Sequence, residues 1–251
     1  MIAGNEAARI RRALESVRGW AAEIIVVLNA EVNDGTDALA AGLGARVFRE
    51  PWQGHIAQKN SAVAKAGQPW VLGLDADEVV SPELIAEIQQ LFAAPEKLAS
   101  FAAFSFPRCT YYCGRWIRHG DWYPDRKIRL WRRGQGHWGG VNPHDRVIVS
   151  GRTGRLKKDL LHFSNESINR QIEKLVPFSD EFVRHRLATG RRTGWLDLAV
   201  RPGWRFFRAY VLRRGFLDGW PGYYIAWLNA FSALTRHVKV CEAKLPERSR
   251  P

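Results

Sequence analysis

The sequence is poor in cysteine and has no long apolar run. Its three cysteines among 251 residues exclude a disulfide-stabilised scaffold. Cys109 and Cys113 have no second cysteine pair to complete a zinc site, so we expect ordinary thiols in a reducing compartment. No segment reaches the roughly 18–20 uncharged apolar residues of a membrane span, because the best candidate, 219–235, contains Pro221 and Asn229. The N-terminus also lacks a signal-peptide pattern, which favours a cytoplasmic protein.

Charge is distributed unevenly along the chain. The net charge is +13, and 46% of the residues are hydrophobic, as is usual for a folded globular protein. Residues 1–100 carry a net charge of −4, whereas residues 101–251 carry +17. A basic half attracts polyanions, so nucleic acid, anionic lipid headgroups and phosphorylated substrates are candidate partners.

Helix and strand signals alternate over the first hundred residues. Apolar runs predict strands over 24–28, 46–48 and 70–74, and helical spacing predicts helices over 10–17 and 56–65. Ser81 and Pro82 are typical of the N-cap and first position of a further helix. This alternation of strands and helices predicts an α/β fold with a mostly parallel sheet flanked by helices.

The pattern changes after residue 100. Short strand candidates lie among Gly, Arg and Trp at 102–106, 127–131, 147–150 and 156–162. From Glu166 onward the apolar residues recur at helical spacing. We therefore predict one domain over 1–165 and a helical C-terminal region over 166–251.

Paired carboxylates follow the predicted strand 70–74 directly. Asp75 and Asp77 are separated by one residue, at the end of a strand where open parallel sheets bind their ligands. Two such carboxylates can share Mg²⁺ or Mn²⁺, which would hold a diphosphate as it leaves. The alternative is a plain strand-to-helix turn, in which acidic residues favour the coming helix N-terminus.

Several short motifs occur in order along nearly the whole chain. They are Asn5-Glu6, Asp34-Gly35-Thr36, Gln58-Lys59-Asn60, Leu74-Asp75-Ala76-Asp77-Glu78, Trp122-Tyr123-Pro124-Asp125, Arg129-Leu130, His144-Asp145 and Gly215-Phe216-Leu217-Asp218-Gly219. Together they resemble family-2 glycosyltransferases with the GT-A (Rossmann-like) fold. Within that family the chain is most similar to the lipopolysaccharide-core β-1,4-glucosyltransferase group.

The resemblance implies a site for a nucleotide-sugar donor. Glu6 would line the uridine pocket, Lys59 would lie near the diphosphate or base, and Asp75 would contact the donor. Asn29 occupies the position where the family tends to have an aspartate at the end of a strand. Lys59 could equally be a solvated helix residue. The segment Met1-Ile2-Ala3 is too short for the apolar first strand of related enzymes, so we expect that strand to be truncated.

The resemblance also implies the chemistry. Asp75 and Asp77 would form the metal motif, with His144 completing the metal or diphosphate site, and the metal would be Mg²⁺ or Mn²⁺. Asp125 matches the general base, which removes a proton from an acceptor hydroxyl in a single inverting displacement. The alternatives are a structural histidine at 144 and a turn residue at 125.

Arginines alternate with aromatic residues near the C-terminus. Arg201, Arg205, Arg208, Arg213 and Arg214 are interleaved with Trp204, Phe206, Phe207 and Tyr210, and further aromatic residues follow at helical spacing. This composition is typical of a segment that lies at a membrane interface. The alternative is a helix packed on the catalytic domain with arginines on its outer face.

These observations converge on one function. We expect an inverting hexosyltransferase that moves glucose from UDP-glucose to a lipopolysaccharide-core or other phosphorylated glycolipid. It would act at the anionic inner face of the cytoplasmic membrane as a peripheral protein. A non-catalytic membrane-associated relative is the main alternative. A nucleic-acid-binding protein is less favoured, since no standard nucleic-acid motif is present, and we expect no nucleic-acid partner.

Overall fold

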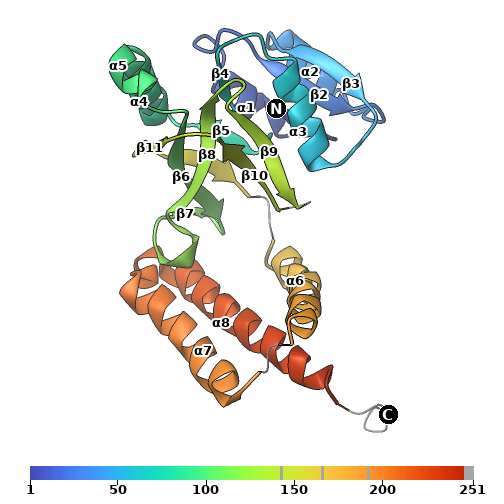
Figure 1. Cartoon of the computed structure of the whole chain (residues 1–251), viewed down its shortest axis with the longest axis vertical. Coiled ribbons are helices and arrows are strands. Elements are labelled where there is room, and N and C mark those ends of the chain that lie inside the picture. Colours follow the sequence, from blue (N-terminus) through green and yellow to red (C-terminus); the bar gives the residue numbers. More distant parts are fainter. Residues whose placement is uncertain (142–143, 165–166, 191–192, 246–251) are drawn as a thin grey trace. The chain divides into compact units, whose positions relative to one another are not determined.

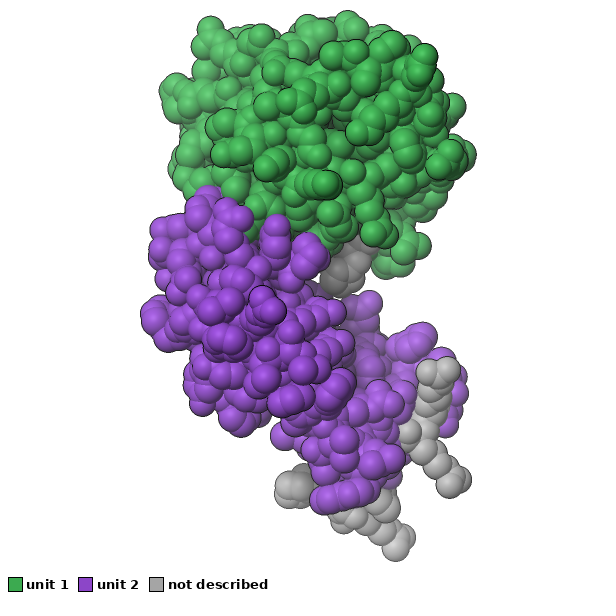
Figure 2. All heavy atoms as spheres, turned by 90° about the vertical axis from the view of Figure 1, so that its left-hand side faces the viewer, with its two compact units in different colours: residues 1–109, 125–163 green, residues 110–124, 164–251 purple. Residues whose placement is uncertain are grey.

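The computed structural model describes residues 1–141, 144–164, 167–190 and 193–245, with only the backbone of His144. The chain divides into two compact units (Figure 2). Unit 1 comprises Met1–Cys109 and Asp125–Phe163, and unit 2 comprises Thr110–Pro124 and Ser164–Pro251. The helical C-terminal part therefore also includes a segment from the middle of the sequence.

A small parallel sheet forms the N-terminal part of unit 1 (Figure 1). Its strands, in spatial order, are β1 (Ile2–Ala3), β2 (Ile25–Asn29) and β3 (Arg46–Glu50). The helices of this part are α1 (Ile10–Glu15), α2 (Thr36–Gly42) and α3 (His55–Ala64). The first four residues of β2 are buried, as expected for an apolar β-branched strand covered on both faces. Parallel pairing was predicted for this part of the chain and is confirmed.

A larger mixed sheet completes unit 1. The order β4-β8-β6-β12-β5 runs through β4 (Trp70–Leu72), β8 (Asp125–Arg132), β6 (Ala103–Tyr112), β12 (Leu160–Phe163) and β5 (Glu78–Val80). A short strand, β11 (Thr153–Arg155), also pairs with β6. The last residues of β6 pair with β7 (Arg115–Ile117), and this pairing belongs to unit 2. β4 is antiparallel to β8, β6 is antiparallel to β8, and β12 is antiparallel to β5, whereas β11 is parallel to β6, so the larger sheet is mixed.

The helix predicted after the acidic turn is confirmed. It is α4 (Pro82–Phe92), and the Ser81 side chain accepts a hydrogen bond from the backbone N–H of Leu84 at 3.1 Å. Its apolar face packs into the core of the larger sheet through Leu84, Ile88 and Leu91. A short helix, α5 (Pro95–Ala99), and a hairpin of β9 (Gly136–Val141) and β10 (His144–Val149) complete unit 1.

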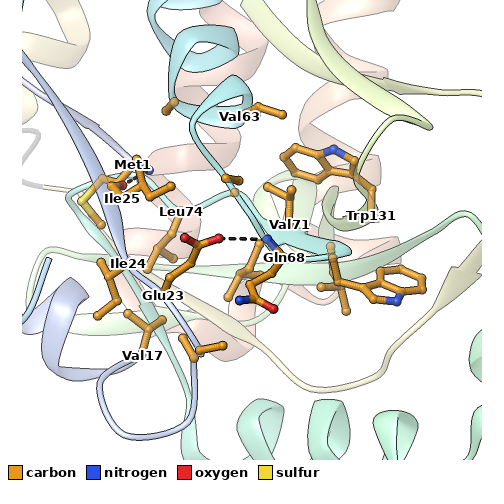
Figure 3. A pocket seen from close by; sticks show the side chains of 18 of the residues that line it. Met1, Val17, Glu23, Ile24, Ile25, Val63, Gln68, Val71, Leu74 and Trp131 are labelled. Carbon is orange, nitrogen blue, oxygen red and sulfur yellow. Dashed lines mark hydrogen bonds between the residues drawn. The ribbon is translucent and has the colours of Figure 1, made fainter. Parts of the chain in front are cut away.

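An apolar cavity of about 440 Å³ lies beside the short first strand (Figure 3). Its lining includes Ile24 and Ile25 at the start of β2 and Trp70 and Val71 of β4. β1 and β4 are the end strands of their respective sheets, so the cavity lies where neither sheet continues. β1 contains two residues, Ile2 and Ala3.

Unit 2 is mainly helical. Its helices are α6 (Ile168–Ala188), α7 (Trp195–Phe207), a π-helical turn (Arg208–Leu212), a 3₁₀ turn (Gly215–Asp218) and α8 (Gly219–Glu242). Asp218 ties the two chain segments together, because its carboxylate accepts from the backbone N–H groups of Arg118 at 3.1 Å and His119 at 2.8 Å. In the described part of the chain, none of the helices is both long enough and apolar enough to cross a membrane.

Candidate active site

The acidic turn begins where β4 ends. Gly73 follows the strand, and a Cβ at this position would lie 2.8 Å from the Trp138 ring and 3.0 Å from the Trp131 ring. Only glycine therefore allows the chain to pass this close to the two indoles. The backbone N–H of Gly73 donates to the carbonyl of Arg129 at 2.7 Å, which fixes the direction in which the turn leaves the sheet.

Asp75 lies between two cationic side chains. One carboxylate oxygen is 2.7 Å from the Lys59 ammonium, and the other is 2.7 Å from the Arg129 guanidinium. Burial alone would raise the pKa of Asp75, but the charges and hydrogen bonds of Arg129 and Lys59 outweigh it and hold this pKa well below its usual range. Asp75 is therefore ionised, and both of its oxygens are engaged within the protein.

Asp75 and its two cationic partners belong to a larger group of charged side chains. We call this group the buried ion cluster, and it consists of Lys59, Asp75, Glu78, Arg129 and Asp145. Glu78 is fully buried, receives a 2.7 Å bond from Arg129 and accepts from the backbone N–H of Asp75 at 3.0 Å. Lys59 also donates to Asp145 at 2.8 Å. Burial lowers the pKa of Arg129 in itself, but Asp75 and Glu78 raise it overall, which keeps the guanidinium charged.

Asp77 lies on a more open edge of unit 1. Its carboxylate is 3.3 Å from His162 Nε2, and about a third of its side chain is exposed. Burial acts to raise the pKa of Asp77, but the hydrogen bond and charge of His162 lower it overall. Burial raises the pKa of Glu6, and although Arg9 opposes this, the charges of Asp77 and Asp34 add to the rise. The structure thus brings Glu6 and Asp77 into one acidic neighbourhood.

Asp125 begins β8 and is held by two cations. Arg108, its partner in the β6–β8 register, donates to one carboxylate oxygen at 2.8 and 3.1 Å. The other oxygen is 3.0 Å from the Lys127 ammonium. Arg108 also lies 3.5 Å from Glu78, which connects Asp125 to the buried ion cluster. Asp125 keeps about a third of its side chain exposed, so a solvent-borne hydroxyl can approach it.

The two other predicted residues lie apart from these contacts. Asn29 ends β2, and its side-chain oxygen accepts from the backbone N–H of Glu31 at 3.4 Å. The side chain of His144 lies outside the described residues, so its predicted role stays a prediction. Its neighbour Asp145 is the residue that reaches Lys59.

Comparison with known proteins identifies the family. Residues 1–150 match the family model described as glycosyl transferase family 2. The chain belongs to this family. An uncharacterised glycosyltransferase of Rickettsia felis is 30% identical to this glycosyltransferase, with 99% of the chain and 90% of the relative covered. The lipopolysaccharide core biosynthesis glycosyltransferase LpsC of Rhizobium meliloti is 28% identical, with 93% and 90% covered.

The GT-A prediction is confirmed by this membership and by the mixed α/β architecture of the glycosyltransferase. Among solved structures, the chain is similar to Staphylococcus aureus TarS in complex with UDP-GlcNAc. The structural alignment includes 95% of this chain and 82% of the TarS chain. The identity is 12% and the TM-score is 0.49. The family membership supports a nucleotide-sugar donor.

The fit of a divalent metal can be tested on the side chains themselves. Among the described residues of this glycosyltransferase, no group of three His, Cys, Asp or Glu side chains is arranged to hold an ion. Asp75 already faces Lys59 and Arg129 with both oxygens, and Asp77 faces His162. In this arrangement the side chains do not form a ready metal site, because both oxygens of Asp75 are already engaged.

Sequence reasoning missed part of the cluster. Glu78 and Asp145 were noted only as members of motifs, and Trp138 was not noted at all. The Trp138 ring lies under both cations, 4.2 Å from the Lys59 ammonium and 5.1 Å from the Arg129 guanidinium. The Arg129-Leu130 motif was the available signal, since an arginine between the apolar residues Ile128 and Leu130 of a strand needs an acidic partner if it is buried.

Proposed function

We propose that this glycosyltransferase moves a hexose, glucose in the first instance, from a UDP-sugar to a phosphorylated glycolipid of the lipopolysaccharide core. The observation that carries the proposal is the Asp125 carboxylate, which is partly exposed and connected through Arg108 to the cluster around Asp75. The printed name of the Rhizobium relative, lipopolysaccharide core biosynthesis glycosyltransferase, supports the acceptor class.

Asp125 is the proposed general base. In the inverting step the acceptor oxygen forms a bond to the anomeric carbon while the bond from that carbon to the diphosphate oxygen breaks. The nucleoside diphosphate leaves with the electron pair, and the hydroxyl proton passes to Asp125. Arg108 and Lys127 contact the two oxygens of Asp125 and fix its orientation, so the base is pre-positioned before the acceptor arrives.

The donor would lie along the edge formed by Glu6, Asp75 and Asp77. In this proposal Glu6 and Asn29 contact the uridine side, and Lys59 and Asp75 contact the diphosphate side. Lys59 and Arg129 supply positive charge next to Asp75, which offsets the repulsion between that carboxylate and an anionic donor. Dependence on Mg²⁺ or Mn²⁺, with Asp75, Asp77 and His144 as ligands, is a further expectation, and chelation during turnover tests it.

The cellular setting is part of the same proposal. A glycolipid acceptor resides in a membrane, so the protein would act peripherally on the inner face of the cytoplasmic membrane. Cell fractionation tests this setting: the protein should sediment with membranes in low salt and be released in high salt.

The deciding experiment measures UDP release from a panel of UDP-sugars with a phosphorylated lipopolysaccharide-core oligosaccharide, with and without Mn²⁺. Asp125→Asn should lower turnover by about 10²–10⁴-fold, the usual contribution of a general base. Asp37→Asn is the matched control, because Asp37 on α2 forms an exposed ion pair with Arg49 of β3. Wild-type protein that binds donor without turnover would identify a non-catalytic relative instead.

A further inference from the structure

Exposed apolar side chains gather in one stretch of unit 2. The described chain exposes 24 large apolar side chains, and 13 of them lie between Trp195 and Phe231. Unit 1, with more residues, exposes four. Scattered exposed apolar residues need no explanation, but such a concentration marks a surface that meets another phase or partner.

On α7 these residues form one stripe. The exposed positions recur at intervals of three or four along the helix and the π-helical turn that follows: Leu196, Val200, Trp204, Phe207 and Val211. Side chains at this spacing lie on the same face of a helix. Trp204 is 52% exposed at the middle of the stripe, so α7 presents an apolar face that α8 does not cover.

Ring contacts join this helix to exposed aromatic residues of α8. The Phe206 ring lies 4.7 Å from the Trp227 ring, and the Tyr210 ring lies 5.4 Å from the Tyr223 ring, centroid to centroid. Both α8 partners are about half exposed. We define the aromatic face as the α7 stripe together with the exposed aromatic residues of α8: Leu196, Val200, Trp204, Phe207, Val211, Trp220, Tyr223, Trp227 and Phe231.

The charges around the aromatic face have one sign at the surface. Unit 2 carries 18 Lys and Arg against nine Asp and Glu, a net charge of +9. The acids between Trp195 and Phe231 are Asp197 and Asp218, which are only 8% and 2% exposed. The same stretch contains five arginines: Arg201, Arg205, Arg208, Arg213 and Arg214. Arg201 pairs with Asp197, and Arg208 and Arg213 pair with Asp121. Arg205 and Arg214 have no acidic partner among the described residues, so the surface combines aromatic rings with an excess of positive charge.

We infer that the aromatic face docks on an anionic phospholipid surface, with the rings of α7 and α8 at headgroup depth and the arginines against lipid phosphates. Tryptophan and tyrosine favour the interfacial region, where an apolar ring and a polar N–H or O–H are both accommodated. Arginine stems cover apolar surface while the guanidinium reaches phosphate. Aromatic residues and arginine are also enriched at protein interfaces, so a protein partner is one outcome of the test, and the net charge of +9 on unit 2 favours the anionic lipid surface. The inference rests on the proposed glycolipid acceptor for its biological setting.

The test is flotation of the full chain with vesicles of 30% phosphatidylglycerol in phosphatidylcholine. We expect binding that falls steeply with salt, and much weaker binding to pure phosphatidylcholine. Trp204→Ala should lower the partition coefficient about tenfold, as expected for losing a half-exposed indole from the interface. Trp52→Ala is the matched control, because Trp52 is 46% exposed but lies in unit 1. The partition coefficient of this variant should equal that of the wild type.

A second variant separates charge from apolar contact. Arg205→Gln with Arg214→Gln should lower binding to anionic vesicles about tenfold or more and leave the weak binding to neutral vesicles unchanged. Wild-type protein that does not float with anionic vesicles, or equal losses in Trp204→Ala and Trp52→Ala, would overturn the inference. A third outcome is wild-type protein that self-associates but does not bind vesicles, with self-association abolished by Trp204→Ala. This outcome would show that the aromatic face binds a second copy of the chain instead.

The two proposals fail in different ways. Turnover of a UDP-sugar with a water-soluble core oligosaccharide needs no vesicle, so it tests the proposed reaction alone. Vesicle binding without any turnover would contradict the proposed reaction and support the docking surface. Turnover without vesicle binding would support the proposed reaction and contradict the docking surface.

Discussion

Replacing Arg129 with methionine tests the buried ion cluster most directly. The substitution keeps much of the side-chain volume but leaves Asp75 and Glu78 without the guanidinium that lies 2.7 Å from each. Removing one partner of a buried ion pair costs about 3–5 kcal/mol. The loss falls mainly on Glu78, which is fully buried and would keep Arg108 at 3.5 Å, since Asp75 would retain Lys59 at 2.7 Å. For a protein of this size we expect a fall in melting temperature of about 10 °C.

The stability difference between wild type and Arg129→Met should also change with pH in a defined direction. The pKa of Asp75 is lowered in the folded wild type, so its ionised contacts add stability above its unfolded pKa, and this contribution is lost as the pH falls through the folded pKa. In Arg129→Met, Asp75 keeps Lys59 but loses Arg129, so its pKa is lowered less and it takes up a proton at a higher pH than in the wild type. The stability gap between wild type and variant should therefore be largest near pH 7 and should narrow as the pH falls below about 4, the ordinary range of an aspartate pKa.

Thermal and urea unfolding followed by circular dichroism between about pH 2.5 and 8 measures both effects, because this range includes the ordinary aspartate pKa. Arg49→Met is the control, because Arg49 pairs with Asp37 at the surface and such pairs contribute about 0–1 kcal/mol. A loss in Arg129→Met no larger than that of the control, or a gap that does not change with pH, would refute our account of the cluster.

Three further substitutions probe other parts of the fold by their unfolding free energies. Ser81→Ala removes the acceptor for the Leu84 N–H and should cost about 1 kcal/mol, whereas an unchanged free energy would show that this cap is unimportant. Gly222→Ala should destabilise unit 2 by more than 2 kcal/mol, because its new Cβ would lie 2.0 Å from the Gly215 carbonyl oxygen; a tolerated alanine would contradict this packing. Ala66→Leu adds methylene groups to the lining of the apolar cavity and should raise the melting temperature, and a lower one would show that the cavity cannot accept them.

The elements that depend on local pattern were predictable, and the contacts that depend on tertiary structure were not. β2 and the capped start of α4 follow from an apolar β-branched run and from Ser81 before Pro82. Lys59 shows the limit, because a lysine on a helix is expected to be solvated, whereas it is only 8% exposed. Its burial depends on Asp145, 86 residues along the chain, and no local signal reports such a pairing.

The mixed larger sheet shows the same limit. The strand signals at 70–74 and 127–131 are both present in the sequence, but their antiparallel pairing as β4 and β8 depends on how distant segments return to each other. The hairpin strand β9 was missed because its sequence, with three glycines among six residues, has low strand propensity. Its register is fixed by β10 along the full length of the hairpin.

The discontinuous composition of unit 2 has a practical consequence for dissecting the enzyme. The chain crosses from one unit to the other three times, after Cys109, after Pro124 and after Phe163. A protein cut at Ser164 would retain Tyr112 and Ile117 but would lose Ile225, which packs with them in one core. Catalytic fragments designed by simple C-terminal truncation should consequently be insoluble, and a soluble minimal version would need the 110–124 segment replaced by a short polar linker.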